Sequence, residues 1–173
     1  KPPLQLYRDY MPLGVRESIR NFFHNLYEPS YVINSLLQAR WYDSTVAGRR
    51  FIINSTFGGL GFFDPAGEHL DPVERPFDQT LGVWGLEPGP YIVWPFLGPS
   101  SARGTVGLVG DMFMDPTYYV NEVDGMIVVT GVRVVNDASF RLDQFESLER
   151  YTVDPYSAIK NYYERQLDRR SRE

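Results

Sequence analysis

A 55-residue stretch from Arg50 to Gly104 combines the turn residues of a loop with the apolar content of a core. Eleven of the fifteen glycines lie between residues 58 and 110, and seven of the thirteen prolines lie between residues 65 and 99. Proline removes a backbone donor and glycine weakens regular elements, so no long helix or strand fits here. We expect short helical turns over 78–84. The string PYIVWPFLGP permits at most an edge strand or one arm of a hairpin, because it contains three prolines.

Amphipathic helical patterns flank this segment on both sides. Residues 15–27 place apolar side chains at helical spacing, and we expect Pro29 to end this helix and Ser30 to cap the next. Residues 124–150 begin with a Val-rich half that also suits a strand, but the later apolar spacing favours a helix throughout. Asp154 and Pro155 are typical of a helix start. The sequence therefore predicts an all-α fold in a single domain over residues 1–173, with helices over residues 15–27, 31–40, 44–54, 102–114, 124–150 and 154–173.

Composition excludes several classes of protein. Hydrophobic residues make up 43% of the chain and aromatic residues 15%, which is typical of a folded protein. The formal net charge of -5 argues against a nucleic-acid partner or general attraction to anionic lipid. Without cysteine, the chain has no disulfide, thiol nucleophile or Cys-ligated zinc. Its longest apolar run, GMIVVTGVRVV, is shorter than a membrane span and contains Arg133. Membrane contact would therefore need apolar burial or a covalent anchor.

Catalytic motifs are incomplete in this sequence. GPSSARG resembles a nucleophile elbow, but Ala102 stands where the motif requires glycine. Only His24 and His69 are available as histidine bases. GGLGFF has Asp64 where a dinucleotide fingerprint requires its third glycine. The carboxylates from Asp64 to Glu74 do not have the spacing of a calcium loop. We therefore expect no catalytic residue, no metal ligand and no cofactor, and the chain is not predicted to be an enzyme.

A resemblance to a known family rests on long strings in a fixed order. Between residues 50 and 116 the chain contains RFIINSTFGGLGFFDPAG, FDQTLGVWGLEPGPYIVWPFLGPSSARG and VGDMFMDP. YRDYMPLGVRESIRNFFHNLYEP precedes them and DPYSAIKNYYERQ follows them. Over roughly residues 7–165 these strings resemble the MlaA family, also called VacJ, of bacterial outer-membrane phospholipid-binding lipoproteins. We expect the signal peptide and anchor cysteine of that family to lie outside this sequence. Residues 115–124 look shorter than in better-known relatives.

The resemblance implies a ring-like, doughnut-shaped helical domain, embedded without spanning in the inner, periplasmic leaflet of the outer membrane. Its Gly/Pro-rich hairpin region, residues 58–104, would line a central amphipathic channel. The implied function is passive removal of mislocalised phospholipid from the outer leaflet and its transfer to a periplasmic, MlaC-like lipid-shuttle protein. A trimeric porin is the implied membrane partner. The transported ligand would be phospholipid.

Candidate site residues follow from the composition of the hairpin region and from the family. Apolar side chains there suit acyl chains, Ser100 and Ser101 suit a polar headgroup, and Arg103 suits a phosphate. Gly89 and Gly98 are candidate hinges. Alternatively, the aromatic residues fill a core and Arg103 pairs with an acidic partner such as Asp111. The candidate lipid-path residues are Asn54, Phe57, Tyr91, Ile92, Val93, Phe96, Leu97, Ser100, Arg103 and Asp111.

Two alternative functions remain open at this stage. The chain can be a porin-associated interaction protein that conducts no lipid. It can also be a secreted lipid hydrolase, which requires a serine of the GPSSARG string within hydrogen-bonding distance of a histidine. Exposed large aromatic rings would support contact with a membrane, because indole and phenol rings favour the headgroup boundary, whereas uniformly buried rings would not. The rings in question are Trp41, Phe62, Phe63, Trp84 and Trp94.

Overall fold

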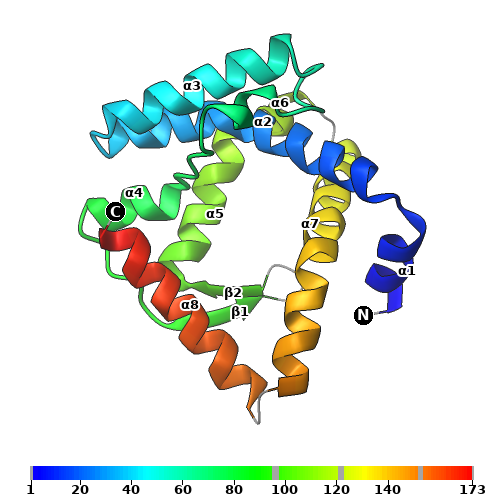
Figure 1. The fold of residues 1–173 in the computed structure, drawn as a ribbon. Helices are drawn as coiled ribbons and strands as arrows, with labels where there is room; N and C mark the ends of the chain where they lie inside the picture. Colours follow the sequence, from blue (N-terminus) through cyan, green and yellow to red (C-terminus); the bar gives the residue numbers. More distant parts are fainter. Residues whose placement is uncertain (1, 95–97, 121–122, 152–153, 173) are drawn as a thin grey trace.

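The computed structural model of the chain describes residues 2–94, 98–120, 123–151 and 154–172. The fold is mostly helical, as predicted (Figure 1). The one sheet among the described residues is a two-stranded antiparallel hairpin within the predicted Gly/Pro-rich hairpin region, and it pairs Tyr91 with Ser101 and Trp94 with Gly98. The elements are α1 (Pro2–Tyr10), α2 (Leu13–Leu37), α3 (Trp41–Thr56), η1 (Pro65–Glu68), α4 (Phe77–Val83), β1 (Tyr91–Trp94), β2 (Gly98–Ser101), α5 (Ala102–Met114), α6 (Pro116–Val120), α7 (Val123–Tyr151) and α8 (Pro155–Arg172).

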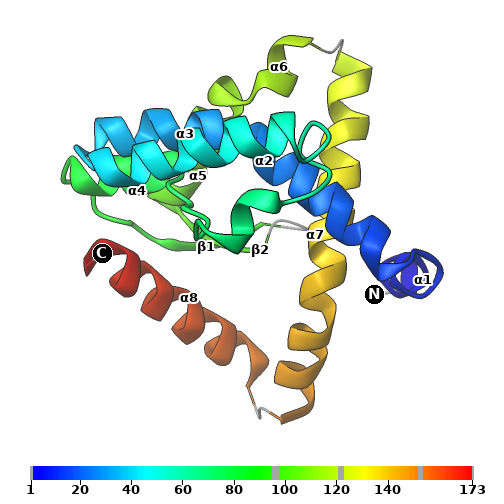
Figure 2. The ribbon, with the colours of Figure 1, turned by 45° about the horizontal axis from the view of Figure 1, so that its top comes forward.

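Neighbouring elements contact one another in a closed circuit. Helix α2 packs against α7, α7 against α8, α8 against β2, β2 against α5, and α5 against α2 (Figure 1). Helix α3 lies along α2 outside this circuit, and α4 packs against α5 (Figure 2). Helix α1 contacts α7. The C-terminal helix α8 thereby returns to elements near the middle of the sequence.

The prediction that Pro29 ends a helix is wrong. Helix α2 is continuous from Leu13 to Leu37 with Pro29 inside it. Side chains on both sides of the proline are held by other elements: Glu28 bonds to Arg50 of α3, and Asn34 bonds to Thr80 of α4. Tertiary packing therefore outweighs the backbone hydrogen bond that proline removes.

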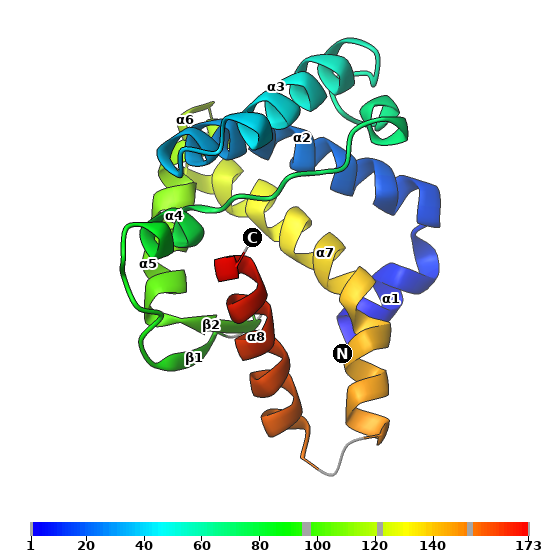
Figure 3. The ribbon, with the colours of Figure 1, turned by 60° about the vertical axis from the view of Figure 1, so that its left-hand side comes forward.

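Helix α3 is longer than predicted at both ends, and the glycines after it form a tight turn. Gly61 has a φ of +96°, a conformation that favours glycine. A Cβ atom at Gly61 would lie 2.5 Å from the Cβ of Asn25, so only glycine allows the turn to contact α2 this closely. Beyond the turn, residues 62–76 run beside α2 and α3 (Figure 3).

The distribution of polarity is inverted relative to an ordinary globular protein. Among the residues whose side chains the structure describes, only six apolar ones are buried, whereas seventeen polar or charged ones are. Large apolar side chains lie outside, on α2, α3, the turn after α3, α4, α5 and α7. No helix among the described residues is long and apolar enough to cross a membrane. The buried polar residues are Arg16, Asn25, Glu28, Ser30, Asn34, Ser35, Gln38, Ser44, Arg50, Asn54, Gln79, Thr80, Ser100, Ser101, Asp115, Asn136 and Ser139.

A buried ionic cluster joins α2, α3 and the segment after α3. The Arg50 Nε donates to Glu28 at 2.9 Å, and its Nη2 donates to both oxygens of Asp64 at 3.0 Å. The exposed fractions of the Glu28 and Arg50 side chains are 0% and 2%. Asn54 donates to Asp64 at 2.8 Å and accepts from the Ala66 backbone. The guanidinium thus bonds to groups from two other segments and fixes how α3 lies on α2.

We expect the substitution Glu28→Gln to lower the free energy of unfolding by about 3–5 kcal/mol, because it leaves the Arg50 charge buried with one partner fewer. Lys160→Ala is the matched control. Lys160 is 3.8 Å from Glu164 on the exposed side of α8, and its removal should change stability by less than about 1 kcal/mol. Chemical denaturation of the purified protein in detergent measures the free energy of unfolding of both variants. Equal effects of the two substitutions would contradict the assigned role of the cluster.

His24 adds a titratable group to this cluster. Its Nδ1 lies 3.3 Å from Glu28, and its Nε2 lies 3.6 Å from Glu74. Burial alone would lower the pKa of His24, but the two carboxylates outweigh it and raise the pKa to about 9. The folded protein therefore holds this proton more tightly than the unfolded chain does.

Because the pKa of His24 is raised on folding, its contribution to stability should be fully present below pH 6.5 and lost as the pH rises to about 9. We expect this loss to be about 3 kcal/mol. His24→Gln should flatten the dependence of the unfolding midpoint on pH over that window. His69→Gln, at an exposed position, should keep the wild-type dependence. If His24→Gln kept the wild-type dependence of the unfolding midpoint on pH, a group other than His24 would be responsible for that dependence.

Candidate functional site

An open cavity of about 370 Å³ lies among α5, α7, α8 and β2. These elements belong to the closed circuit of contacts seen in Figure 1. The lining mixes charged, hydroxyl, aliphatic and aromatic groups, so the cavity is amphipathic. The lining residues are Pro76, Asp78, Gly98, Pro99, Ser100, Gly104, Leu108, Asp111, Arg133, Val134, Asp137, Ala138, Arg141 and Tyr163.

The hairpin leads directly into the α5 wall. Ser101 caps α5 by accepting from the Gly104 backbone at 3.0 Å. The backbone groups of Ala102 and Arg103 donate to carbonyls of Pro90 and Pro88, which satisfies further N–H groups at the start of the helix. The 88–90 segment and the end of β2 therefore hold the start of α5 in place.

Glycines on α5 allow other elements to approach this wall. A Cβ at Gly107 would lie 2.5 Å from the Asp78 Cβ, and one at Gly110 would lie 2.3 Å from the Phe77 ring. Gly104 faces Ser100 and the hydroxyl of Tyr163. The start of α4 can sit directly on α5 because these positions lack side chains.

Asp111 joins the cavity to a buried polar network. Its Oδ1 accepts from the Phe77 backbone at 2.9 Å and from Asn34 at 3.5 Å. Asn34 in turn accepts from Thr80, and Thr80 accepts from Gln38 at 2.9 Å. Burial raises the pKa of Asp111 to about 7, while the bond from the Phe77 backbone opposes this shift. Asp111 therefore changes charge near neutral pH.

The α7 wall presents three charged residues on successive turns: Arg133, Asp137 and Arg141. Arg133 bonds to the Tyr27 hydroxyl, lies 4.7 Å from the centre of the Tyr27 ring and is 3.5 Å from Asp115. Burial raises the pKa of Asp137, although Arg141 and Arg133 act in the opposite direction. This wall therefore carries charges of both signs.

The aromatic part of the lining comes from α8. Tyr163 lies with its ring centre 5.7 Å from that of Tyr91 in β1. This contact connects the hairpin to the C-terminal helix beside the cavity.

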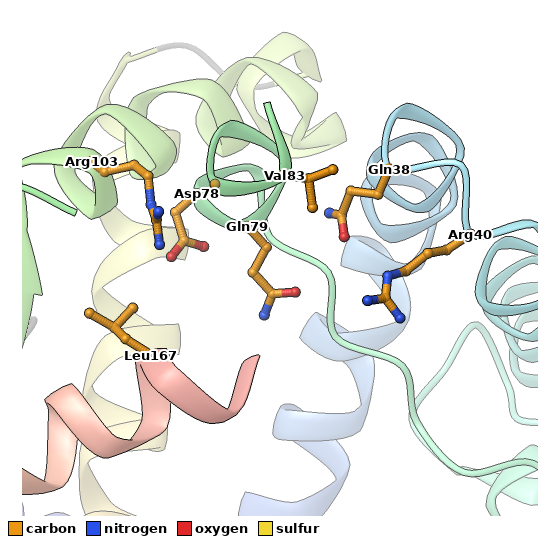
Figure 4. A pocket seen from close by; sticks show the side chains of 8 residues that line it. Gln38, Arg40, Asp78, Gln79, Val83, Arg103 and Leu167 are labelled. Atoms are coloured by element: carbon orange, nitrogen blue, oxygen red, sulfur yellow. The ribbon is translucent and has the colours of Figure 1, made fainter. Parts of the chain in front are cut away.

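A second, smaller pocket of about 110 Å³ contains Arg103 (Figure 4). Arg103 Nη1 donates to the Leu86 carbonyl at 2.7 Å. Among the described residues no bond joins Arg103 to Asp111, which accepts from the Phe77 backbone; Asp78 is the acidic residue that lines this pocket with Arg103. The pocket is lined by Gln38, Arg40, Asp78, Gln79, Gly82, Val83, Arg103 and Leu167.

The candidate lipid-path residues fall in different places. Ser100, Asp111 and the hinge candidate Gly98 line the larger cavity. Tyr91 and Ile92 are half-buried in β1, and Val93 is exposed there. Asn54 is part of the ionic cluster, Phe57 is 82% exposed after α3, and Gly89 precedes the hairpin. Phe96 and Leu97 lie outside the described residues.

Four charged lining residues were not among the sequence-based candidates: Asp78, Arg133, Asp137 and Arg141. Three of them recur every four residues in a helix that is otherwise Val-rich. Charge at helical spacing within an apolar segment is the signal that would have indicated them.

The hydrolase alternative lacks its required geometry. Among the described residues, Ser100 donates to the Ser101 carbonyl and Ser101 accepts from Gly104. No hydrogen bond joins either serine to His24, which pairs with carboxylates, or to His69. A serine–histidine nucleophile is therefore not formed in the described structure.

A buried charged network, an apolar exterior and an amphipathic cavity together define a mostly helical protein suited to an apolar environment. The chain belongs to the MlaA lipoprotein family, whose family model matches residues 1–170.

Relatives and a solved structure agree with this assignment. The intermembrane phospholipid transport system lipoprotein MlaA of Escherichia coli (strain K12) is 30% identical over 169 residues, which cover 94% of this chain and 66% of that protein. An uncharacterized protein of Rickettsia felis is 34% identical over 150 residues, 85% of this chain and 59% of its own length. The chain thus spans about 60% of the length of these relatives. A structure described as "Structural basis for maintenance of bacterial outer membrane lipid asymmetry" is 28% identical, with a TM-score of 0.83 over 98% of this chain and 86% of that one.

Gly107→Ala should destabilise the protein by about 1–3 kcal/mol, because the new methyl group overlaps Asp78 at the α4–α5 contact. The control is Gly131→Ala in α7, where a Cβ meets nothing within 4 Å. That change should stabilise the protein by about 0.5–1 kcal/mol, since alanine favours helix more than glycine does. Thermal unfolding followed by circular dichroism distinguishes the two. A neutral Gly107→Ala would contradict the close packing described here.

Proposed function

We propose that this protein is a passive conduit for phospholipid in the outer membrane. It removes mislocalised phospholipid from the outer leaflet and transfers it to a periplasmic lipid-shuttle protein. The observation that carries this proposal is the amphipathic cavity within a protein whose exterior is apolar. The Escherichia coli relative is named as a lipoprotein of an intermembrane phospholipid transport system, which supports the same function.

The physical problem is the cost of exposing acyl chains to water. A diacyl phospholipid has roughly thirty methylenes, and their transfer to water costs on the order of 20–25 kcal/mol. A passive path must keep the tails against apolar groups and give the headgroup polar partners. In the cavity, Leu108 and Val134 can contact the acyl chains. The headgroup can find polar partners in Asp111, Asp137 and Arg141. Its volume of about 370 Å³ suits a headgroup and the adjoining part of the chains.

The exterior supports embedding in one leaflet. The rings of Trp41, Phe63 and Trp84 are 69%, 66% and 55% exposed. Trp84 donates to the Leu37 carbonyl at 3.3 Å, which places it near the α2–α3 turn that leads to Trp41. Phe62 and Trp94 are also exposed. Indole rings with one end bonded and one face exposed are suited to the headgroup boundary of a bilayer. We place the protein in the periplasmic leaflet, held in addition by a lipid anchor.

We propose that the closed circuit of elements forms a ring around the lipid path, and that the hairpin is its movable part. Gly89 and Gly98 have φ values of +69° and +90°; Gly89 precedes β1, and Gly98 is the first residue of β2. A Cβ at Gly98 meets nothing within 4 Å, so the residue is not fixed by close packing. Gly98 is therefore suited to act as a hinge. Gly89 is more closely packed, because a Cβ there would lie 3.0 Å from the Ala102 Cβ, and we propose it as the second hinge on its positive φ alone.

A trimeric porin and a periplasmic, MlaC-like shuttle are the proposed partners. The competing function is a porin-associated protein that conducts no lipid. The cavity favours conduction, because a protein with a purely adhesive role needs no amphipathic interior.

Ala138→Trp tests conduction by filling the cavity from the α7 wall. In cells that carry only this variant, we expect phospholipid to accumulate in the outer leaflet, as measured by labelling at the cell surface. Val132→Trp on the same helix is the control, since Val132 is 44% exposed, and it should keep transport. Porin co-purification should be unchanged in both. Normal outer-leaflet lipid in folded Ala138→Trp would favour the porin-associated alternative.

A further inference from the structure

The cavity contains more acidic than basic side chains. Asp78, Asp111 and Asp137 line it together with Arg133 and Arg141. The carboxylates come from three different segments, so they face the cavity from both the α5 side and the α7 side. A ligand that carries only negative charge therefore meets repulsion as well as attraction.

The two arginines are not equivalent. The positive charge of Arg133 is compensated by Asp115, which lies 3.5 Å away and does not line the cavity. The Arg133 guanidinium also lies against the Tyr27 ring. Arg141 lies two helical turns further along α7 and is exposed. A phosphate group entering the cavity thus finds its best bidentate partner in Arg141.

One helical turn separates Arg141 from Asp137, about 6 Å along the helix axis. In an ethanolamine headgroup two carbons separate the ammonium from the phosphate oxygen. The distance between its two charged groups is therefore comparable to the spacing of Arg141 and Asp137. A phosphate on Arg141 would therefore place the ammonium near Asp137, with Asp111 on the opposite wall. A primary ammonium donates three hydrogen bonds, which carboxylates accept.

On the basis of the conduit function proposed above, we propose that this cavity selects phospholipids with a zwitterionic headgroup that ends in a primary ammonium. Arg141 binds the phosphate, and Asp137 and Asp111 bind the ammonium. Glycerol headgroups offer no cation to the carboxylates. Choline headgroups offer no N–H donor, and they favour aromatic cages, whereas Tyr163 is the one aromatic residue among the described lining.

The test uses vesicles with equal amounts of phosphatidylethanolamine, phosphatidylglycerol and phosphatidylcholine, all with the same acyl chains. The purified full chain in detergent is incubated with them and re-isolated, and its bound lipid is identified by mass spectrometry. We expect phosphatidylethanolamine to be enriched about three- to tenfold over each of the other two lipids. The double substitution Asp111→Asn/Asp137→Asn should abolish the enrichment and keep the total bound lipid.

Further variants separate charge recognition from folding. Asp137→Asn alone should reduce the enrichment even if the double variant does not fold. Arg141→Gln should lower the total bound lipid of all three classes. Asp71→Asn, an exposed carboxylate outside the cavity, should keep the wild-type pattern.

Three results would overturn the proposal. Bound lipid without preference for phosphatidylethanolamine, or a preference that survives the carboxylate substitutions, would refute the selectivity and leave the conduit function standing. A wild-type protein that binds none of the three lipids would refute the conduit function itself, and the selectivity with it.

Discussion

The structure depends on buried polar groups that satisfy one another. Arg50 bonds to Glu28 and Asp64, and Asp111 connects through Asn34 to Thr80. Burial removes the water that would otherwise bond to these groups, so each unsatisfied hydrogen bond among them is costly. The helices are consequently positioned by directional bonds more than by the close packing of large apolar side chains. That inversion of interior and exterior makes both the exposed aromatic rings and the polar-lined cavity possible.

The sequence was sufficient to predict most of the helices and the hairpin. Helical spacing indicated α2, α5 and α8, and three prolines correctly limited PYIVWPFLGP to a hairpin arm. The position of Pro29 was misinterpreted, because local rules cannot show that Glu28 and Asn34 are held by α3 and α4. The apolar content of residues 50–104 belongs largely to the surface, not to a core: Phe57, Phe63 and Trp84 are all exposed.

The candidate site was harder to predict because it depends on long-range contacts. The sequence-based candidates included Ser100 and Asp111, which line the cavity, and also Arg103, which lines a separate pocket. The opposite wall comes from α7, where the sequence drew attention only to Arg133, and only as a reason against a membrane span. Which face of α7 lines the cavity opposite α5 and β2 is decided by the closed circuit of contacts, and no local pattern encodes that circuit.

The contact between Tyr91 and Tyr163 joins two parts of the chain that are separated by more than seventy residues. If β1 swings, Tyr163 has to follow or lose its aromatic neighbour, so the hairpin and α8 are mechanically linked. A displacement of α8 would therefore be transmitted to the hairpin and to the cavity wall beside it. A molecule that touches this helix from outside would alter the opening without entering it.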